Sequence, residues 1–133
     1  MAKVVIIGGG PGGYEAALVA TQLGAEVTVI EKDGIGGSAV LTDVVPSKAL
    51  VAVAEAAIDA QSASIIGVHT SDVHIEFAKV NSRLKQWATN QSRHIFDSLI
   101  AAGVHVISGR GELISENQVK AISESGEQLL EAD

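Results

Sequence analysis

Three glycines near the N-terminus have the spacing of a phosphate-binding loop. Gly8, Gly10 and Gly13 follow the apolar run 4–7 in a G-x-G-x-x-G pattern. The first permits a tight turn, the second lets the backbone approach a pyrophosphate without a Cβ, and the third allows close helix-to-strand packing. Pro11 suits the first position of a helix whose free N–H groups attract an anion. The pattern predicts a pyrophosphate site.

Glu31 is the acid that completes such a site. It follows the apolar run 27–30, at the end of the second predicted strand, where a carboxylate can accept hydrogen bonds from the ribose hydroxyls. The alternative is a glycine-rich turn beside an incidental surface glutamate, but the full series of strand, loop, helix, strand and acid favours binding. FAD and NAD share the ADP half, so both fit this fingerprint.

The elements that position these residues form a βαβ unit. Runs 4–7 and 27–30 are β-branched and continuous, which is typical of parallel strands buried on both faces. The Ala-rich stretch 11–23 between them is predicted to be a helix that ends at Gly24. Such a crossover is right-handed in nearly all proteins.

The remaining chain predicts a helical hairpin and a β-hairpin. A loop at 33–37 precedes a long helix opened by Pro46 and ended by Gly67, and a second helical stripe runs from Phe77 to Trp87. That stripe resumes after a break at Ile95 and Leu99 and stops before Gly103. The last predicted elements are a third parallel strand at 104–107 and a hairpin formed by 111–114 and 119–122.

Composition narrows the function classes. The 133 residues, 47% of them hydrophobic, suffice for one modest core, so we expect a single unit. A net charge of -7 without a basic cluster argues against nucleic acid and anionic membranes and favours small-molecule ligands. The absence of cysteine excludes disulfides and thiol chemistry. The short N-terminal apolar run predicts no signal peptide and no membrane insertion, hence a cytoplasmic protein.

The loop and the start of the long predicted helix form one continuous segment, which reads Gly36-Gly37-Ser38-Ala39-Val40-Leu41-Thr42-Asp43-Val44-Val45-Pro46-Ser47-Lys48. This segment resembles the flavin segment of the pyridine nucleotide-disulfide oxidoreductases, especially the dihydrolipoamide dehydrogenases. The family pattern there is G-G-T-C-x-x-x-x-C-x-P-S-K. With the glycine loop, the Glu31-Lys32 pair and the turn 109–111, the resemblance covers nearly the whole chain. It implies FAD rather than NAD as the bound dinucleotide, and a Rossmann-like α/β domain that is incomplete at its C-terminus.

The resemblance also implies roles for individual residues. The pyrophosphate would be wrapped by Gly8, Gly10, Pro11, Gly12 and Gly13. Glu31 and Lys32 would meet the adenosine, and the Arg110-Gly111 backbone would meet the adenine. The central part of FAD would be lined by Gly36, Gly37 and Ser38. Lys48 would approach the N5 edge of the isoalloxazine.

Ala39 and Val44 depart from the family, because they occupy the positions of its two redox cysteines. Neither side chain can form a thiolate, so electrons from reduced flavin cannot pass through a disulfide. The sequence is similar to the branch of bacterial NAD(P)H:quinone reductases with an incomplete cysteine pair. There, reduced flavin gives its electrons directly to a quinone or another diffusible acceptor.

Length is a second departure, because subunits of the family continue well beyond residue 133. The resemblance implies that residues 1–133 are the N-terminal portion of an FAD-binding domain, without the NAD(P)H-binding and dimerisation domains. NAD(P)H would be the electron donor of the full-length enzyme, which would be a homodimer. The alternatives are a truncated, non-catalytic nucleotide-binding module and a stand-alone NAD dehydrogenase domain, the latter contradicted by segment 36–48.

Other candidate residues favour structural roles. The four histidines lack a metal-ligand spacing, so no metal site is predicted. Ser47 has no oxyanion-hole signature around it, which favours helix capping over nucleophilic catalysis. Lys48 judged by position alone would be a solvated lysine, an interpretation that the family resemblance reverses. Trp87 is assigned to a core or an interface rather than to flavin stacking. A solvated acidic face is expected from Glu124, Glu127, Glu131 and Asp133.

Overall fold

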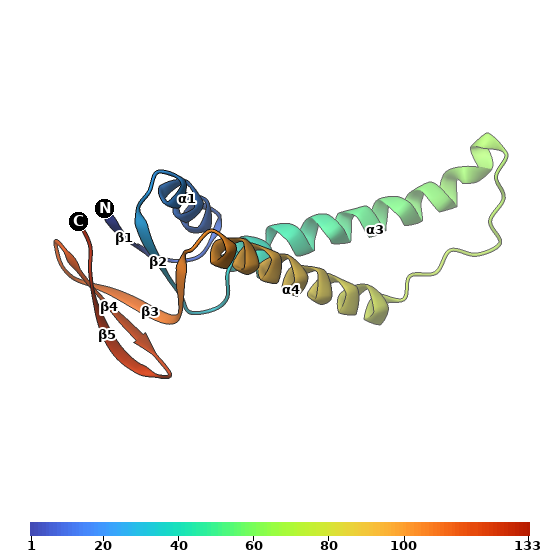
Figure 1. Cartoon of the computed structure of the whole chain (residues 1–133). Helices are drawn as coiled ribbons and strands as arrows, with labels where there is room; N and C mark the ends of the chain where they lie inside the picture. The colour runs from blue at the N-terminus through green and yellow to red at the C-terminus, as the bar shows by residue number, and fades with distance from the viewer.

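The computed structural model describes residues 1–133 and contains one five-stranded sheet in the order β1-β2-β3-β4-β5 (Figure 1). The strands are β1 (Lys3–Ile7), β2 (Glu26–Glu31), β3 (His105–Ser115), β4 (Gln118–Ser123) and β5 (Gly126–Glu131). Strands β1, β2 and the first part of β3 are parallel, whereas β3, β4 and β5 pair in antiparallel fashion. The predicted α/β class is confirmed.

Four α-helices and one 3₁₀-helix complete the fold. They are α1 (Pro11–Gln22), α2 (Gly37–Leu41), α3 (Val44–Ser62), the 3₁₀-helix η1 (Ala63–Ile66) and α4 (Phe77–Ala101). Helix α1 lies beside β1 and β2, while α3 and α4 form a long hairpin that projects from the sheet (Figure 1). The predicted helical hairpin is therefore present.

The βαβ unit follows the sequence prediction closely. Strands β1 and β2 pair in register from Lys3 opposite Glu26 to Ile7 opposite Ile30. Helix α1 begins at Pro11, and the chain leaves it through Gly24 with a φ of 85°, a left-handed conformation that glycine adopts without steric cost. The crossover thus brings the ends of β1 and β2 to one edge of the sheet.

Two predicted strands are in fact one. Residues 105–107 of the first predicted strand and all of 111–114 lie in the continuous strand β3, which pairs with β2 through Ser108 and with β4 from Gly109 onward. Gly109 suggested a break, but a Cβ there would collide with the Ile122 carbonyl oxygen. The glycine therefore permits close pairing at the point where the strand changes partners.

The predicted break in the second long helix is also wrong, because α4 runs without interruption from Phe77 to Ala101. Helix α3 begins at Val44, which places Pro46 in its first turn, where the missing N–H costs no helical hydrogen bond. The five-residue helix α2 was not predicted, since its sequence is too short to show a helical period.

Strand β5 is a further element that the sequence interpretation missed. The side chains of Glu124, Glu127, Glu131 and Asp133 are exposed, as expected of a solvated face. The backbone of 126–131 nevertheless pairs with β4, and the half-buried Leu130 packs against the small buried cluster that contains Val119. Asp133 is also tied to β1, because its carboxylate accepts the Lys3 amide at 2.8 Å.

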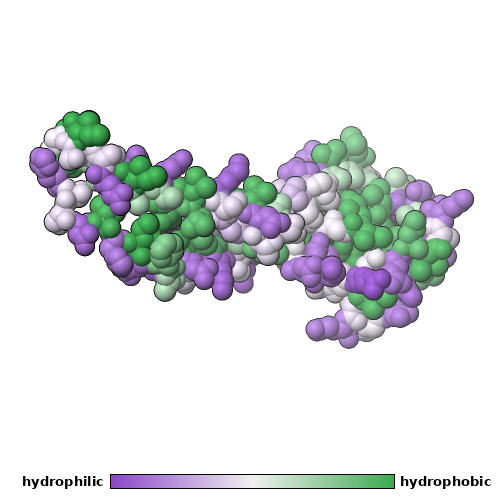
Figure 2. Space-filling view, turned by 180° about the vertical axis from the view of Figure 1, so that it is seen from behind, coloured by the Kyte–Doolittle hydropathy of each residue, from purple (hydrophilic) through white to green (hydrophobic).

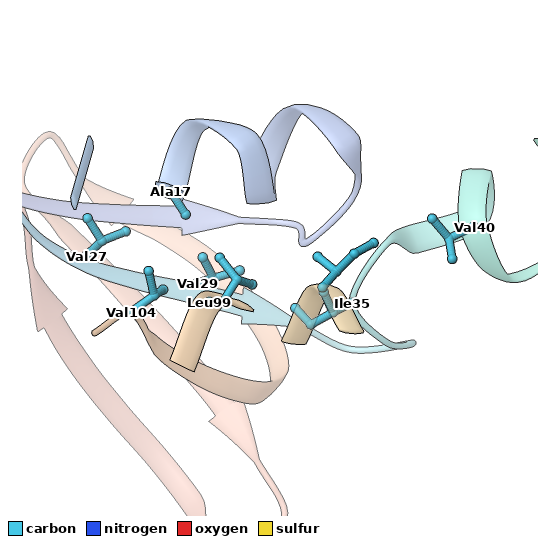
Figure 3. Close-up of a cluster of buried hydrophobic side chains, with 8 residues drawn as sticks. Ala17, Val27, Val29, Ile35, Val40, Leu99 and Val104 are labelled. Atoms are coloured by element: carbon cyan, nitrogen blue, oxygen red, sulfur yellow. The ribbon is translucent and has the colours of Figure 1, made fainter. Parts of the chain in front are cut away.

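The main core lies between α1, the parallel strands and the sheet-proximal end of α4 (Figure 3). Its buried members are Ala17, Val27, Val29, Ile35, Val40, Ile95, Leu99 and Val104. A smaller cluster on the opposite face of the sheet contains Ile30, Val119 and Ala121. Because successive strand residues alternate between faces, Val29 and Ile30 anchor the two cores from adjacent positions.

The outer part of the hairpin has no comparable core. Helix α3 contains no buried residue, and apolar side chains lie exposed along the projecting arm (Figure 2). The run Gly37–Ile66 is long and apolar enough to cross a membrane by length and composition, and the 18-residue window that meets this criterion contains no buried residue. It is interrupted at Thr42 and Asp43 and carries Glu55 and Asp59, which disfavours a span because ionised carboxylates are costly in hydrocarbon.

Candidate functional site

The glycine loop has the backbone that its spacing predicts. Gly8 has a φ of 103°, and its amide donates to the Ile30 carbonyl at 2.8 Å, which ties the end of β1 to β2. A Cβ at Gly13 would collide with the Gly8 carbonyl oxygen, whereas a Cβ at Gly10 would meet no atom within 4 Å. Gly13 therefore allows close packing inside the protein. Gly10 faces open space, where its own backbone can approach a ligand.

A cavity of about 520 Å³ opens beside this loop. Several of the predicted cofactor-binding residues line it together, namely Gly8, Glu31, Lys32, Gly37, Ser38, Arg110 and Gly111. They come from the end of β1, the end of β2, the start of α2 and the middle of β3. Segments distant in the sequence thus converge where two parallel strands end, the place at which α/β folds bind nucleotides.

The other predicted residues have different positions. Gly10 adjoins the cavity, because a Cβ at Gly37 would lie 3.1 Å from the Gly10 Cα. Gly36 is buried and contacts the glycine loop, because its amide donates to the Gly9 carbonyl at 2.7 Å. Pro11, Gly12 and Gly13 open helix α1. Lys48 is exposed on α3 and does not line the cavity.

Glu31 organises the loops around the cavity. One carboxylate oxygen, Oε2, accepts the Gly9 amide at 2.7 Å, and Oε1 accepts the Asp33 amide at 2.7 Å. A carboxylate oxygen can accept two hydrogen bonds, so each retains capacity for a ribose hydroxyl. The acid that the sequence assigned to the ligand therefore also shapes the protein backbone around it.

Two residues of this arrangement were missed by sequence reasoning. Gly9 supplies both an amide to Glu31 and a carbonyl to Gly36, and the three consecutive glycines at 8–10 were a signal that its position is sterically restricted. Ile35 is buried with 5% of its surface exposed, and a Cβ at Gly9 would lie 2.6 Å from its Cδ1. A single isoleucine within a glycine-rich loop was a signal for such an anchor.

The charged side chains at the cavity are weakly engaged. Lys32 lies 3.4 Å from Asp33, and Arg110 lies 3.2 Å from Glu112. Exposed ion pairs of this kind contribute less than about 1 kcal/mol, so both cations can exchange their partner for a ligand anion at low cost. The positive N-terminal end of α1 and these two cations would attract the negative charge of a phosphorylated ligand.

The positions of the family cysteines contain no sulfur. Ala39 lies half-buried in α2, and Val44 begins α3 with 47% of its surface exposed. The histidines form no cluster with acids that could hold a metal ion. Thiol chemistry at these two positions is excluded by the sequence itself.

Two other sequence expectations need correction. The Ser47 hydroxyl donates to the Val44 carbonyl at 3.1 Å inside the first turn of α3, so it does not cap the helix, whose N-cap is Asp43. Trp87 does not belong to a core, because 44% of its surface is exposed, while its assignment to an interface stays a prediction. Its ring faces the Arg83 guanidinium, 5.0 Å from the ring centroid, in a groove between α3 and α4 remote from the cavity in sequence and in fold.

Comparison with known proteins places this site in a family context. Residues 2–133 match the family described as pyridine nucleotide-disulphide oxidoreductase. The chain is 43% identical over 135 residues to an NAD(P)H dehydrogenase (quinone) of Mycobacterium tuberculosis, covering 93% of this chain. It is 33% identical over 125 residues to dihydrolipoyl dehydrogenase 2 of Haloarcula marismortui, covering 94% of this chain.

The fold comparison agrees with the sequence comparison. The crystal structure of LpdA from Mycobacterium tuberculosis superposes with a TM-score of 0.91 at 41% identity and covers the whole chain. The chain spans 27% and 26% of the length of the two curated relatives and 30% of the LpdA chain. The likeness is thus close in structure and confined to one part of each relative.

Proposed function

Because the chain belongs to the pyridine nucleotide-disulphide oxidoreductase family, we propose that it forms the FAD-binding part of a flavoprotein oxidoreductase. In this proposal electrons pass from NAD(P)H through FAD to a quinone-type acceptor without a redox disulfide. The observation that carries the proposal is the cavity where the glycine loop, Glu31 and β3 converge. Residues 1–133 would be the N-terminal portion of the FAD-binding domain.

The residues present fit an ADP-containing cofactor. Open space at Gly10 admits a pyrophosphate, and the unpaired N–H groups at the start of α1 favour its negative charge. Glu31 holds a carboxylate at the cavity wall, and its remaining lone pairs suit the two ribose hydroxyls. Gly111 lets the β3 backbone lie close to Ile7 and Ile30, and all three residues line the cavity, where we assign the adenine ring.

The remaining assignments extend the cradle toward the flavin. We assign the middle of the cofactor to Gly36, Gly37 and Ser38, because α2 begins at the cavity. Lys48 is assigned to the flavin ring through its place in the P-S-K motif, and its side chain is exposed on α3. FAD bound there would supply hydride acceptance and electron release.

The absence of cysteine supports the choice of acceptor. With Ala39 and Val44 at the cysteine positions, no sulfur lies between the flavin segment and an acceptor, so electrons would leave directly for a small diffusible oxidant. A relative of 43% identity carries the name NAD(P)H dehydrogenase (quinone), which supports a quinone. We propose a cytoplasmic homodimer for the protein with its further domains.

The test of this function uses a protein that carries residues 1–133 together with NAD(P)H-binding and dimerisation domains. We expect it to show a flavin absorbance band, to reduce quinones with NAD(P)H, and to show no thiolate-to-flavin charge-transfer band. Turnover of dihydrolipoamide as fast as of quinones would contradict the assigned acceptor. The matched control is the variant with both cysteines restored, Ala39→Cys and Val44→Cys.

A non-catalytic nucleotide-binding module is a second candidate, favoured by Ala39 and Val44, which remove the thiol chemistry of the family while the cavity beside the glycine loop is kept. It predicts that the chain binds FAD as tightly as the first proposal requires. The two candidates differ on addition of NAD(P)H under anaerobic conditions. The module leaves the flavin absorbance unchanged, and the oxidoreductase with its further domains bleaches it.

A further inference from the structure

Helix α4 presents one polar residue on its buried face. Ala88, Ile95 and Leu99 are buried at helical spacing, and Ser92 lies between them on the same face, half-buried. A serine is a poor choice for an apolar stripe, because an unpaired hydroxyl inside a protein costs free energy. Its presence therefore requires a partner across the interface.

That partner is the Ile35 carbonyl. The Ser92 hydroxyl donates to it at 2.5 Å, which joins residues that are 57 positions apart. Other hydroxyls of α4 behave differently: Thr89 donates to the Lys85 carbonyl and Ser98 to the His94 carbonyl, both one turn earlier in the same helix. Ser92 thus makes a tertiary bond where its neighbours make local ones.

The bonded carbonyl belongs to the loop that supports the glycine cradle. The amide of the next residue, Gly36, donates to the Gly9 carbonyl at 2.7 Å, and the Gly9 amide donates to Glu31. A Cβ on Gly9 would lie 2.6 Å from Ile35 Cδ1, so the Ile35 side chain packs closely against the Gly9 backbone. Ser92 and Gly9 thus hold the two sides of the Ile35–Gly36 peptide unit: the Ser92 hydroxyl donates to its carbonyl, and the Gly9 carbonyl accepts its amide.

We infer that Ser92 is a positioning residue for the dinucleotide cradle. By holding the Ile35 carbonyl, it fixes the plane of the Ile35–Gly36 peptide and so directs the Gly36 amide at Gly9. The bond couples the helical hairpin to the glycine loop. This inference rests on the proposed function, because the ligand that would sense the coupling is FAD.

Ser92→Ala tests the inference in the full chain, with Ser98→Ala as the matched control, since both lose one hydroxyl from α4. Losing the donor leaves the Ile35 carbonyl unpaired, and we expect the dissociation constant for FAD to rise about tenfold. Ser98→Ala should leave the dissociation constant for FAD unchanged. Ser92→Thr retains the hydroxyl and should restore most of the affinity.

Amide hydrogen exchange provides a readout that does not need a ligand. In Ser92→Ala we expect faster exchange at Gly36, while amides in the middle of α4 keep the protection they have in the unsubstituted chain. Unchanged exchange at Gly36, or an equal increase at every protected amide, would overturn the positioning role. If the unsubstituted chain binds no FAD, the proposed function fails, and exchange at Gly36 still decides the role of Ser92.

Discussion

The Glu31 carboxylate and the Gly9 amide are joined by a 2.7 Å hydrogen bond across 22 positions of sequence. The bond ties the end of β2 to the loop that follows β1, so the acid at the end of one strand fixes the phosphate-binding turn of the other. A second bond from the Asp33 amide holds the other carboxylate oxygen. Glu31 is therefore part of the protein framework before any ligand binds.

Replacing this carboxylate tests its double role. In Glu31→Gln one side-chain oxygen becomes an NH₂ group, which cannot accept the amide that it faces. We expect the free energy of unfolding to fall by about 1–3 kcal/mol and FAD binding to weaken. Chemical denaturation and an FAD titration measure the two effects. Glu26→Gln is the control, because Glu26 is exposed on β2, and its effect should stay below about 0.5 kcal/mol.

The glycine loop allows packing to be separated from binding. Gly13→Ala should unfold or strongly destabilise the chain, by about 3 kcal/mol or more, because the new Cβ meets the Gly8 carbonyl oxygen. Gly10→Ala should stay folded, since Gly10 has a φ of -69° and open space around it, yet should lose FAD. Circular dichroism with an FAD titration distinguishes the two. Retained FAD affinity in Gly10→Ala would show that the pyrophosphate lies elsewhere.

At the sheet-proximal end of α4, the side of the helix that faces the core should contribute more to stability than the side that faces solvent. Leu99 is fully buried between the helix and the sheet, so Leu99→Ala should cost about 2–5 kcal/mol. Ile100 is 48% exposed, and Ile100→Ala should cost less than about 1.5 kcal/mol. Thermal or urea unfolding of the pair measures the difference. Equal losses would mean that the hairpin is not anchored through Leu99.

The sequence was sufficient to predict the parts of the fold whose signals are local. The runs 4–7 and 27–30 lie in parallel strands, Gly24 and Gly67 end helical segments with left-handed backbones, and 119–122 lies in a hairpin strand. Each of these signals arises from the residue's own backbone preference or from burial on both faces of a sheet. Such preferences do not depend on distant contacts.

What failed were features decided by distant neighbours. From the sequence, Gly109 indicates the end of a strand, but in the structure the absence of its Cβ permits close approach to Ile122 of the adjacent strand. The sequence of β5 resembles a polar tail, but in the structure its backbone forms hydrogen bonds with β4. At the site, the bonds from Gly9 to Glu31 and from Ser92 to Ile35 join segments 22 and 57 positions apart. The pattern of residues within one segment contains no information about a hydrogen bond to a segment so distant in the sequence.

We propose above all that the cavity beside Gly10 and Glu31 binds FAD. Isothermal titration calorimetry of the full chain with FAD, and in parallel with NAD, tests it most directly. We predict one site for FAD with a micromolar dissociation constant, weaker binding of NAD, and loss of the FAD signal in Gly10→Ala. Absence of FAD binding to a folded chain, or tighter binding of NAD than of FAD, would contradict the claim.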